Sequence, residues 1–224
     1  MTENDRILGL KNQIIDSGLR LLSEGLVSRT FGNVSIRLDG TFMLITPSGR
    51  MYDDLITDDI VIVNYHNYEY MGSIRPSSEF KLHAEVYRSR TEINAVIHTH
   101  QQNASTVAAA HKTLPPILDD MAQLIGADVK VAEYAHSSSD EIVSNTLYAL
   151  EGRMAALMAN HGAICLGRDI EEAFVVSKIL EKACKAYIEA SFLGGAKSID
   201  KFDAQKMHEE YLKKYSAEAE ENRT

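Results

Sequence analysis

The sequence predicts an α/β fold in which helices cover the faces of a mixed β-sheet. Short apolar stretches of strand length are interspersed with longer stretches in which apolar residues recur at helical spacing. Several of the short stretches are separated by only a tight turn, which places neighbouring strands side by side and antiparallel. The remaining strands alternate with helices, and this order is typical of a sheet with helices packed on it.

The first helix is expected from residue 4 to about residue 24. Ile7, Leu10 and Ile14 recur on one helical stripe. Gly18 falls on the same stripe and weakens the pattern in the middle of the helix. Gly25 follows where a helix C-cap commonly stands, so the helix is expected to end there.

A hairpin and a second helix come next. Strands are expected at 33–38 and 42–45, around the tight turn Asp39-Gly40. Ser77, which follows Pro76, is expected to cap a helix that runs to about Arg90. The other expected elements are strands at 60–64, 94–99, 129–132, 155–158 and 163–166, and helices that end near residues 110, 152 and 194 and that cover about 203–215.

Length and composition describe a globular protein, and we expect one domain over residues 1–224. Hydrophobic residues make up 45% of the chain and charged residues 25%, which is ordinary globular usage. No internal repeat and no linker rich in Pro, Gly or Ser divides the sequence. The chain has 23 basic and 32 acidic residues, and the resulting net charge of −9 disfavours binding to nucleic acid or to an anionic membrane.

Cysteine use and the N-terminal sequence predict a cytoplasmic location. The chain has only two cysteines, Cys165 and Cys184, and so lacks a disulfide framework. The N-terminal sequence MTENDRILGLKNQ has acidic residues where a signal peptide needs a basic region and an apolar run. No stretch approaches the ~20 apolar residues of a membrane span.

Two histidines in one expected strand are the sharpest chemical feature. His98 and His100 are two residues apart, so their side chains point to the same face of the strand. Two imidazoles on one face can chelate a divalent cation, and catalytic zinc sites often use three protein ligands. His161, on the expected turn 160–162, is the best third ligand; the alternative is a pair of half-exposed polar residues. The other histidines outside helix 77–90 are expected on the surface: His66, His111, His136 and His208.

Polar groups at the start of helix 77–90 form a second feature. Ser77 and Ser78 offer hydroxyls and free backbone N–H groups to an anion, although an ordinary helix cap explains them too. Glu79 and His83 are four residues apart and share a helix face. We expect a packed or hydrogen-bonded role for His83, with a fourth metal ligand as the alternative.

Two further loops combine small, polar and glycine residues. Gly32 and Asn33 stand in one loop, and Ser48 and Gly49 stand in the other. Such loops bring backbone amides close to a phosphate, but they are also typical of ordinary turns.

Taken together, these features resemble the class II aldolase/adducin family, and within it the fuculose-phosphate aldolase branch. Four blocks carry the resemblance in the family's order and spacing. They are GLVSRTFGNVSIR with LITPSG, PSSEFKLHAEVY, AVIHTHQQNAS and NHGAICLG. The match runs from near residue 7 to near residue 190, and more loosely to Tyr215.

The resemblance implies a fold, an assembly and an activity. The fold is a three-layer α/β/α arrangement around a mostly antiparallel sheet, and the assembly is a homotetramer with active sites at subunit interfaces. The activity is zinc-dependent, reversible cleavage of a ketose 1-phosphate, fuculose-1-phosphate-like or 5-deoxypentulose-1-phosphate-like, to dihydroxyacetone phosphate and an aldehyde. Zinc acts there as a Lewis acid, so no lysine Schiff base is required.

The resemblance also implies roles for individual residues. The metal ligands are His98, His100 and His161, which hold Zn²⁺ or another divalent transition metal. Glu79 ligates or flanks the metal and acts as the proton-transferring base. The substrate phosphate is bound by Gly32, Asn33, Ser48, Gly49, Ser77 and Ser78.

This sequence departs from the fuculose-phosphate branch at one catalytic position. There a tyrosine from a neighbouring subunit protonates the leaving group, whereas here the matching position is Asp119, followed by Asp120. Related ribulose-phosphate 4-epimerases use an aspartate for proton transfer, but they have Asp where this chain has Glu79. Tyr215 stands where the family carries a C-terminal tyrosine near the site. The alternatives left open are a 4-epimerase, a dehydratase or a decarboxylase on the same scaffold, and, less favoured, a non-catalytic adducin-like module.

Overall fold

A seven-stranded sheet forms the centre of the computed structural model, which describes the backbone of residues 2–221 and the side chains of residues 2–214. The strand order is β3-β2-β1-β4-β7-β6-β5. Neighbouring strands are antiparallel except β5 and β6, which are parallel. The strands are β1 (Asn33–Arg37), β2 (Phe42–Ile45), β3 (Val61–Asn64), β4 (Ala95–Thr99), β5 (Val131–Ala132), β6 (Ala155–Met158) and β7 (Gly162–Gly167).

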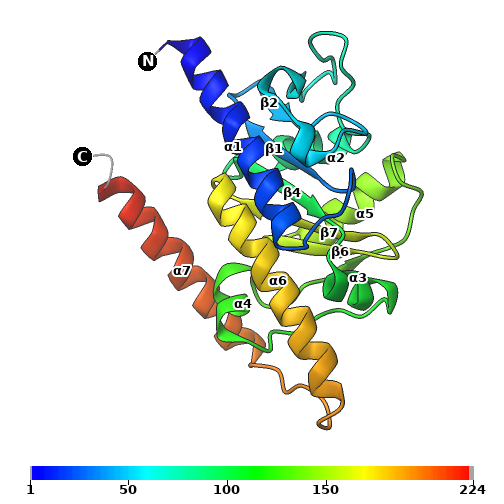
Figure 1. The fold of residues 1–224 in the computed structure, drawn as a ribbon. Coiled ribbons are helices and arrows are strands. Elements are labelled where there is room, and N and C mark those ends of the chain that lie inside the picture. Colours follow the sequence, from blue (N-terminus) through cyan, green and yellow to red (C-terminus); the bar gives the residue numbers. More distant parts are fainter. Residues whose placement is uncertain (1, 222–224) are drawn as a thin grey trace.

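Helices cover both faces of this sheet (Figure 1). The helices α1 (Glu3–Ser23), α3 (Gln102–Ala109) and α6 (Ile170–Ser191) lie on one face, and α2 (Phe80–Ser89) and α5 (Asp140–Leu150) lie on the other. The helices α4 (Asp119–Leu124) and α7 (Lys201–Glu221) pack against each other beside α6. The predicted three-layer α/β/α arrangement with a mostly antiparallel sheet is therefore confirmed.

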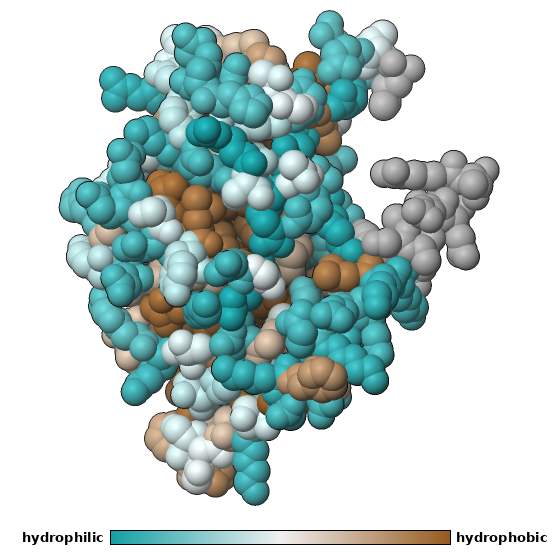
Figure 2. Space-filling view, turned by 180° about the vertical axis from the view of Figure 1, so that it is seen from behind, coloured by the Kyte–Doolittle hydropathy of each residue, from teal (hydrophilic) through white to brown (hydrophobic). Residues whose placement is uncertain are grey.

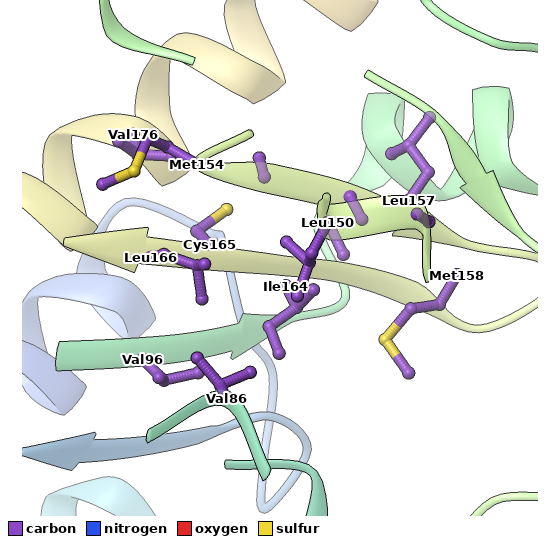
Figure 3. Close-up of a cluster of buried hydrophobic side chains, with 14 of the residues drawn as sticks. Val86, Val96, Leu150, Met154, Leu157, Met158, Ile164, Cys165, Leu166 and Val176 are labelled. Atoms are coloured by element: carbon purple, nitrogen blue, oxygen red, sulfur yellow. The ribbon is translucent and has the colours of Figure 1, made fainter. Parts of the chain in front are cut away.

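Alternation along the strands divides the apolar core between the two faces. On β7, Cys165 points towards Val176 of α6, whereas Leu166 points the opposite way, towards Val96 (Figure 3). Val96 in turn faces Val86 of α2. Because His98 is two residues from Val96 on β4, its side chain emerges on the face that α2 covers.

Gly18, which weakened the helical pattern of α1, has a packing role. A Cβ atom at this position would lie 2.3 Å from Cδ1 of Tyr52, so only glycine admits the tyrosine ring against the helix. Tyr52 stands on the short 3₁₀ helix Tyr52–Asp54, and a second 3₁₀ helix, Thr57–Asp59, follows it. The glycine thus lets the segment after β2 pack directly on α1.

Several element boundaries differ from the predictions. The helix α2 begins at Phe80, slightly later than expected for a helix capped by Ser77. Ser77 Oγ accepts from Glu79 N–H at 3.4 Å and Ser77 O accepts from Phe80 N–H at 3.1 Å, so a turn leads from Ser77 into the helix. The predicted strand 129–132 shortens to Val131–Ala132. Helix α4 was not predicted, and α7 is longer than the predicted 203–215. Within the part of the chain that the structure describes, no helix has the length and apolar character needed to cross a bilayer.

Candidate metal and substrate site

Three histidine side chains meet at one end of the central sheet. His98 lies on β4, His100 follows that strand directly, and His161 stands in the turn between β6 and β7. Each offers one ring nitrogen, and these nitrogen atoms lie within 4.8 Å of one another. The ring centroids are 4.7 to 4.9 Å apart. The structure therefore brings the predicted histidines together as one group that could hold a metal ion.

The pairing of β4 with β7 explains how residues distant in sequence meet. Thr99 is the partner of Ala163, which places the turn before Ala163 beside His100. A Cβ atom on Gly162 would lie 2.2 Å from Thr99 O, so the close approach of the two chains requires glycine there. Asn160 has a φ of 56°, the left-handed conformation that reverses the chain just before His161.

The hydrogen bonds of His98 determine which of its nitrogens is free. The ring Nδ1 donates to Ala163 O at 2.9 Å, so Nε2 is the nitrogen that points into the cluster, 2.8 Å from Nε2 of His100. A backbone carbonyl that accepts from the outer ring nitrogen is a usual support of a metal-ligating histidine. Burial lowers the pKa of His100 to about 3, and burial together with His98 also lowers the pKa of His161. These lowered pKa values favour the neutral form of both rings, which is the form that binds a metal.

The Glu79 carboxylate adjoins this cluster. Oε2 lies 3.2 Å from Nε2 of His98, and Oε1 lies 3.4 Å from Nε2 of His161. Asn33 Nδ2 donates to Oε2 at 2.9 Å. Burial raises the pKa of the Glu79 carboxyl, but the attraction of His98 and His161 and the bond from Asn33 outweigh it, so the pKa lies below its usual value. Within residues 2–214, Oε1 accepts no hydrogen bond although it is buried, so it is free to take a proton or face a cation.

A pocket of about 220 Å³ opens beside Glu79 and two of the histidines. Its lining includes every residue predicted to bind phosphate: Gly32, Asn33, Ser48, Gly49, Ser77 and Ser78. The loop after β2 and the loop before α2 run side by side, because Pro47 and Pro76 form a β-bridge and Ser48 N donates to Arg75 O at 3.0 Å. Three segments distant in sequence thus offer small polar groups to one volume.

Gly32 brings the first of these loops against β4. It has a φ of 83°, and a Cβ atom there would lie 2.7 Å from His98 O. Asn33, the next residue, pairs with His98 in the sheet and reaches Glu79 from that position. The glycine therefore allows one loop to contact both the histidine cluster and the carboxylate.

Some of the pocket residues were not among the predicted site residues: Thr30, Phe31, Pro47 and Ser137. Phe31 is 53% exposed, and its ring stacks on His100 with the centroids 5.6 Å apart. Ser137, in the loop before α5, lines the same pocket. The run 137–139 indicates only a helix cap, so nothing in its local pattern pointed to the pocket.

The structure does not bring Asp119, one of the predicted catalytic residues, to this pocket. Asp119 is the first residue of α4, which packs beside α6, and it is absent from the pocket lining. Asp120 forms an ion pair with Lys182 at 2.6 Å. Tyr215 belongs to α7, but its side chain lies outside the residues whose side chains the structure describes.

The remaining histidines include one wrong prediction. His66, His111 and His136 are exposed as expected. His208 is buried, not on the surface, because its Nδ1 donates to Gln123 O at 2.7 Å and fastens α7 to the end of α4. His83 is fully buried and stands outside the histidine cluster, where its Nδ1 bonds to Ser35 Oγ, so the hydrogen-bonded alternative describes it.

Comparison with known proteins agrees with this geometry. Residues 12–188 match the sequence profile of the class II aldolase and adducin N-terminal domain family. The chain belongs to this family. It is 33% identical over 180 residues to the 5-methylthioribulose-1-phosphate/5-deoxyribulose-1-phosphate aldolase of Rhodospirillum rubrum, with 80% of each chain covered. It is 34% identical to the L-fuculose phosphate aldolase of Escherichia coli, with 80% of this chain and 82% of that protein covered.

Solved structures show the same class II aldolase fold. A structure of L-fuculose 1-phosphate aldolase superposes with a TM-score of 0.87 at 32% identity, covering 91% of this chain and 96% of the other. The L-fuculose-1-phosphate aldolase of Thermus thermophilus superposes with a TM-score of 0.72 at 28% identity, covering 85% of this chain and 98% of the other. The chain is thus a class II aldolase, an aldehyde-lyase of a metal-dependent family, and its histidine group could supply the metal site.

Proposed function

We propose that this chain is a zinc-dependent aldolase that reversibly cleaves a ketose 1-phosphate to dihydroxyacetone phosphate and an aldehyde. The substrate is fuculose-1-phosphate-like or 5-deoxypentulose-1-phosphate-like, in line with the names of the relatives. The observation that carries the proposal is the convergence of three histidine nitrogens next to the buried Glu79 carboxylate.

The donor set fits zinc. His98, His100 and His161 would hold the ion through ring nitrogens, and a site with three protein ligands leaves a position open for substrate oxygens. A bound divalent ion supplies Lewis-acid stabilisation of the negative charge that develops on the ketose oxygens during carbon–carbon cleavage.

Glu79 is proposed as the group that moves a proton to or from the dihydroxyacetone phosphate carbon. Its pKa below the usual value keeps it ionised at neutral pH, as a base requires. The bond from Asn33 to Oε2 fixes one oxygen, and Oε1, which faces His161, accepts no hydrogen bond from the described residues. The carboxylate is thereby oriented and still has an atom available for proton transfer.

The phosphate is proposed to bind in the pocket of about 220 Å³. The loop residues that line it offer hydroxyl, amide and backbone N–H donors. Because these groups surround the phosphate rather than the bond that breaks, their binding energy positions the substrate for cleavage.

A homotetramer is proposed, with Asp119 acting in the site of a neighbouring subunit. Asp119 lies away from the pocket of its own chain, as such a role requires. Large apolar side chains are also exposed at the end of α6, with Phe192 at 84% and Leu193 at 89%, and hydrophobic residues reach the surface on the rear face (Figure 2). We also propose a catalytic role for Tyr215, which stands where the family carries a C-terminal tyrosine near the site. A cytoplasmic location is proposed as well, since neither buried cysteine forms a disulfide.

One observation favours a second candidate. The acids Asp119 and Asp120 stand where the fuculose-phosphate branch has a tyrosine, so a 4-epimerase on the same scaffold is the alternative. Glu79 argues for the aldolase, because those epimerases have Asp in its place. A dehydratase and a decarboxylase on the same scaffold are further alternatives, and a non-catalytic adducin-like module is less favoured.

A coupled assay for dihydroxyacetone phosphate tests the proposal. The panel contains fuculose, rhamnulose and 5-deoxyribulose 1-phosphates, each with Zn²⁺ and with chelator. We expect chelator-sensitive release, abolished in His98→Ala, and the best substrate identifies the aldehyde. No release from any member by protein with bound metal would contradict the aldolase assignment and make the epimerase the leading activity.

A further inference from the structure

The face of β1 that looks towards α2 is polar along its whole length. Asn33, Ser35 and Arg37 alternate along the strand and therefore share this face. Val34 and Ile36 point the other way and are buried in the apolar core beneath α1. One face of a central strand thus carries polar side chains where a core usually packs apolar ones.

The facing side of α2 carries polar groups at matching intervals. Glu79, His83 and Tyr87 follow one another at four-residue spacing and so lie on one side of the helix. The two polar rows are joined by three rungs, which we call the polar ladder: Asn33 Nδ2 to Glu79 Oε2 at 2.9 Å, Ser35 Oγ to His83 Nδ1 at 2.6 Å, and Arg37 Nη2 to Tyr87 O at 2.9 Å.

Ser35 is the hub of the ladder. Its hydroxyl contacts both His83 Nδ1 and, at 2.8 Å, the Tyr87 hydroxyl. Ser35 and His83 are fully buried and Tyr87 is 1% exposed. A buried polar group that loses its partner is costly, whereas an apolar pair of the same shape costs little. The three rungs join α2 to β1 along the helix, so a rotation of α2 about its axis would break them.

His83 transmits this restriction to Glu79. The backbone N–H of His83 donates to Glu79 O, so the two residues bound the first turn of α2. Rotating that turn would break the bond between Ser35 and His83. It would also carry the Glu79 carboxylate away from His98 and His161.

We propose that His83, held by Ser35, is a positioning residue that fixes the rotation of α2 and thereby aims the Glu79 carboxylate at the histidine cluster. The inference rests on the proposed function, because the orientation of the Glu79 carboxylate affects the rate only if this group transfers a proton beside the histidine cluster. A carboxylate displaced by about an ångström from its working position can lose about 100-fold in rate.

Replacement of the hub provides the first test. Ser35→Ala is compared with Ser177→Ala, another buried hydroxyl, which bonds within α6 to Ala173 O. We expect Ser35→Ala to lower kcat roughly 10-fold or more while its KM stays within about twofold of the wild-type value. Ser177→Ala should leave both kcat and KM close to wild type. In the metal-free proteins, Ser35→Ala should raise the rate of amide hydrogen exchange over residues 77–87. The exchange rate of α6 should not change.

Two replacements of His83 provide the second test and do not depend on the first variant folding. Asparagine places an amide near the position of Nδ1 and keeps a partner for Ser35, whereas leucine fills the space and removes the bond. We expect His83→Asn to retain at least about 10-fold more kcat than His83→Leu, although leucine packs better.

Three results would overturn the inference. The first is an equal kcat in His83→Leu and His83→Asn. The second is that Ser35→Ala has the same kcat and KM as Ser177→Ala. The third is that hydrogen exchange in Ser35→Ala becomes faster uniformly along the chain. If the wild-type protein releases no dihydroxyacetone phosphate, the proposed function fails instead. The rate of hydrogen exchange over residues 77–87 in Ser35→Ala would then still show whether Ser35 stabilises the position of α2.

Discussion

The Glu79 carboxylate lies against two imidazoles and one amide, and these neighbours decide its charge. Burial alone would favour the protonated form, but His98, His161 and Asn33 together hold the pKa below its usual value. A neutral isostere at this position would keep the shape of the site and lose the base. A substitution of Glu79 by this isostere therefore tests the chemical role of the carboxylate without changing the fold.

Glu79→Gln should lower kcat by roughly 10²–10⁴-fold while the protein remains folded, because the amide cannot accept the proton. The measurement is dihydroxyacetone phosphate release, together with metal content and circular dichroism. Near-wild-type turnover in the folded, metal-loaded variant would remove Glu79 from the mechanism.

Ser77→Ala should mainly raise KM and leave kcat close to wild type. Ser77 lines the pocket that we propose binds the phosphate, and interactions with a phosphate would be made equally before and during cleavage. Steady-state kinetics with the best ketose 1-phosphate would show the split. A loss confined to kcat, at unchanged KM, would contradict the phosphate assignment.

Among the elements, β4 and β7 approach closely beside the candidate metal site. The two strands meet at Gly162, whose missing side chain lets Thr99 O lie against the backbone. His100 and His161 flank this contact on the two chains. The distance between two of the proposed ligands therefore depends on a residue that binds nothing itself.

Gly162→Ala should abolish stoichiometric metal binding and destabilise the fold by about 1–3 kcal/mol, because the new methyl group must push β4 and β7 apart. Metal content and denaturant midpoints would measure the two effects. The matched control is Gly9→Ala, at an exposed position of α1 with no atom within 4 Å of the new carbon, which should stabilise by about 0.5–1 kcal/mol. Full metal occupancy in Gly162→Ala would show that the close approach is dispensable.

For the molecule as a whole, buried neutral histidines link stability to pH. The pKa of His83 and that of His100 are both lowered to about 3 in the folded protein, by burial first and by His98 next. In the unfolded chain these groups titrate near their ordinary value, about 6.5. Between these values the unfolded chain binds more protons, so acidification favours unfolding.

The metal-free protein should therefore lose stability steadily as the pH falls from about 7.5 to about 5, a range in which carboxylates stay ionised. Denaturant midpoints across this range would show the slope. His83→Asn should flatten it, and His66→Gln, at an exposed histidine, should not. A flat midpoint for the wild-type protein would mean that these rings are protonated in the folded state.

A shared site between subunits can be tested by mixing inactive variants. Glu79→Gln and Asp119→Asn each remove one group, and a cyclic assembly of both subunits would rebuild intact sites at roughly a quarter of its interfaces. We therefore expect co-refolded mixtures to regain activity that neither variant shows alone. If the mixture stays as inactive as its components, Asp119 does not serve a neighbouring site.

The prediction of elements succeeded where a local pattern carried the signal. The hairpin around Asp39-Gly40, strand β4 and the cap of α6 at Asp169 follow from turn residues, alternation and capping. The start of α2 was placed too early: Ser77 Oγ accepts from Glu79 N–H as a capping residue does, but a turn precedes the first helical residue, Phe80. Helix α4 was missed because six residues are too few for a periodic pattern, and its packing on α7 supplies the stability.

The sequence alone was sufficient to predict the fold class, the three histidines and the loops that surround the pocket, because strand alternation and short motifs are local properties. Only the tertiary structure showed that the three histidine nitrogens meet within 4.8 Å, that Ser137 lines the same pocket, and that His83 faces Ser35 across the polar ladder. These contacts join residues from distant segments through strand pairing and helix packing. Such long-range pairings depend on how the whole chain packs, so they leave no mark on the local sequence pattern.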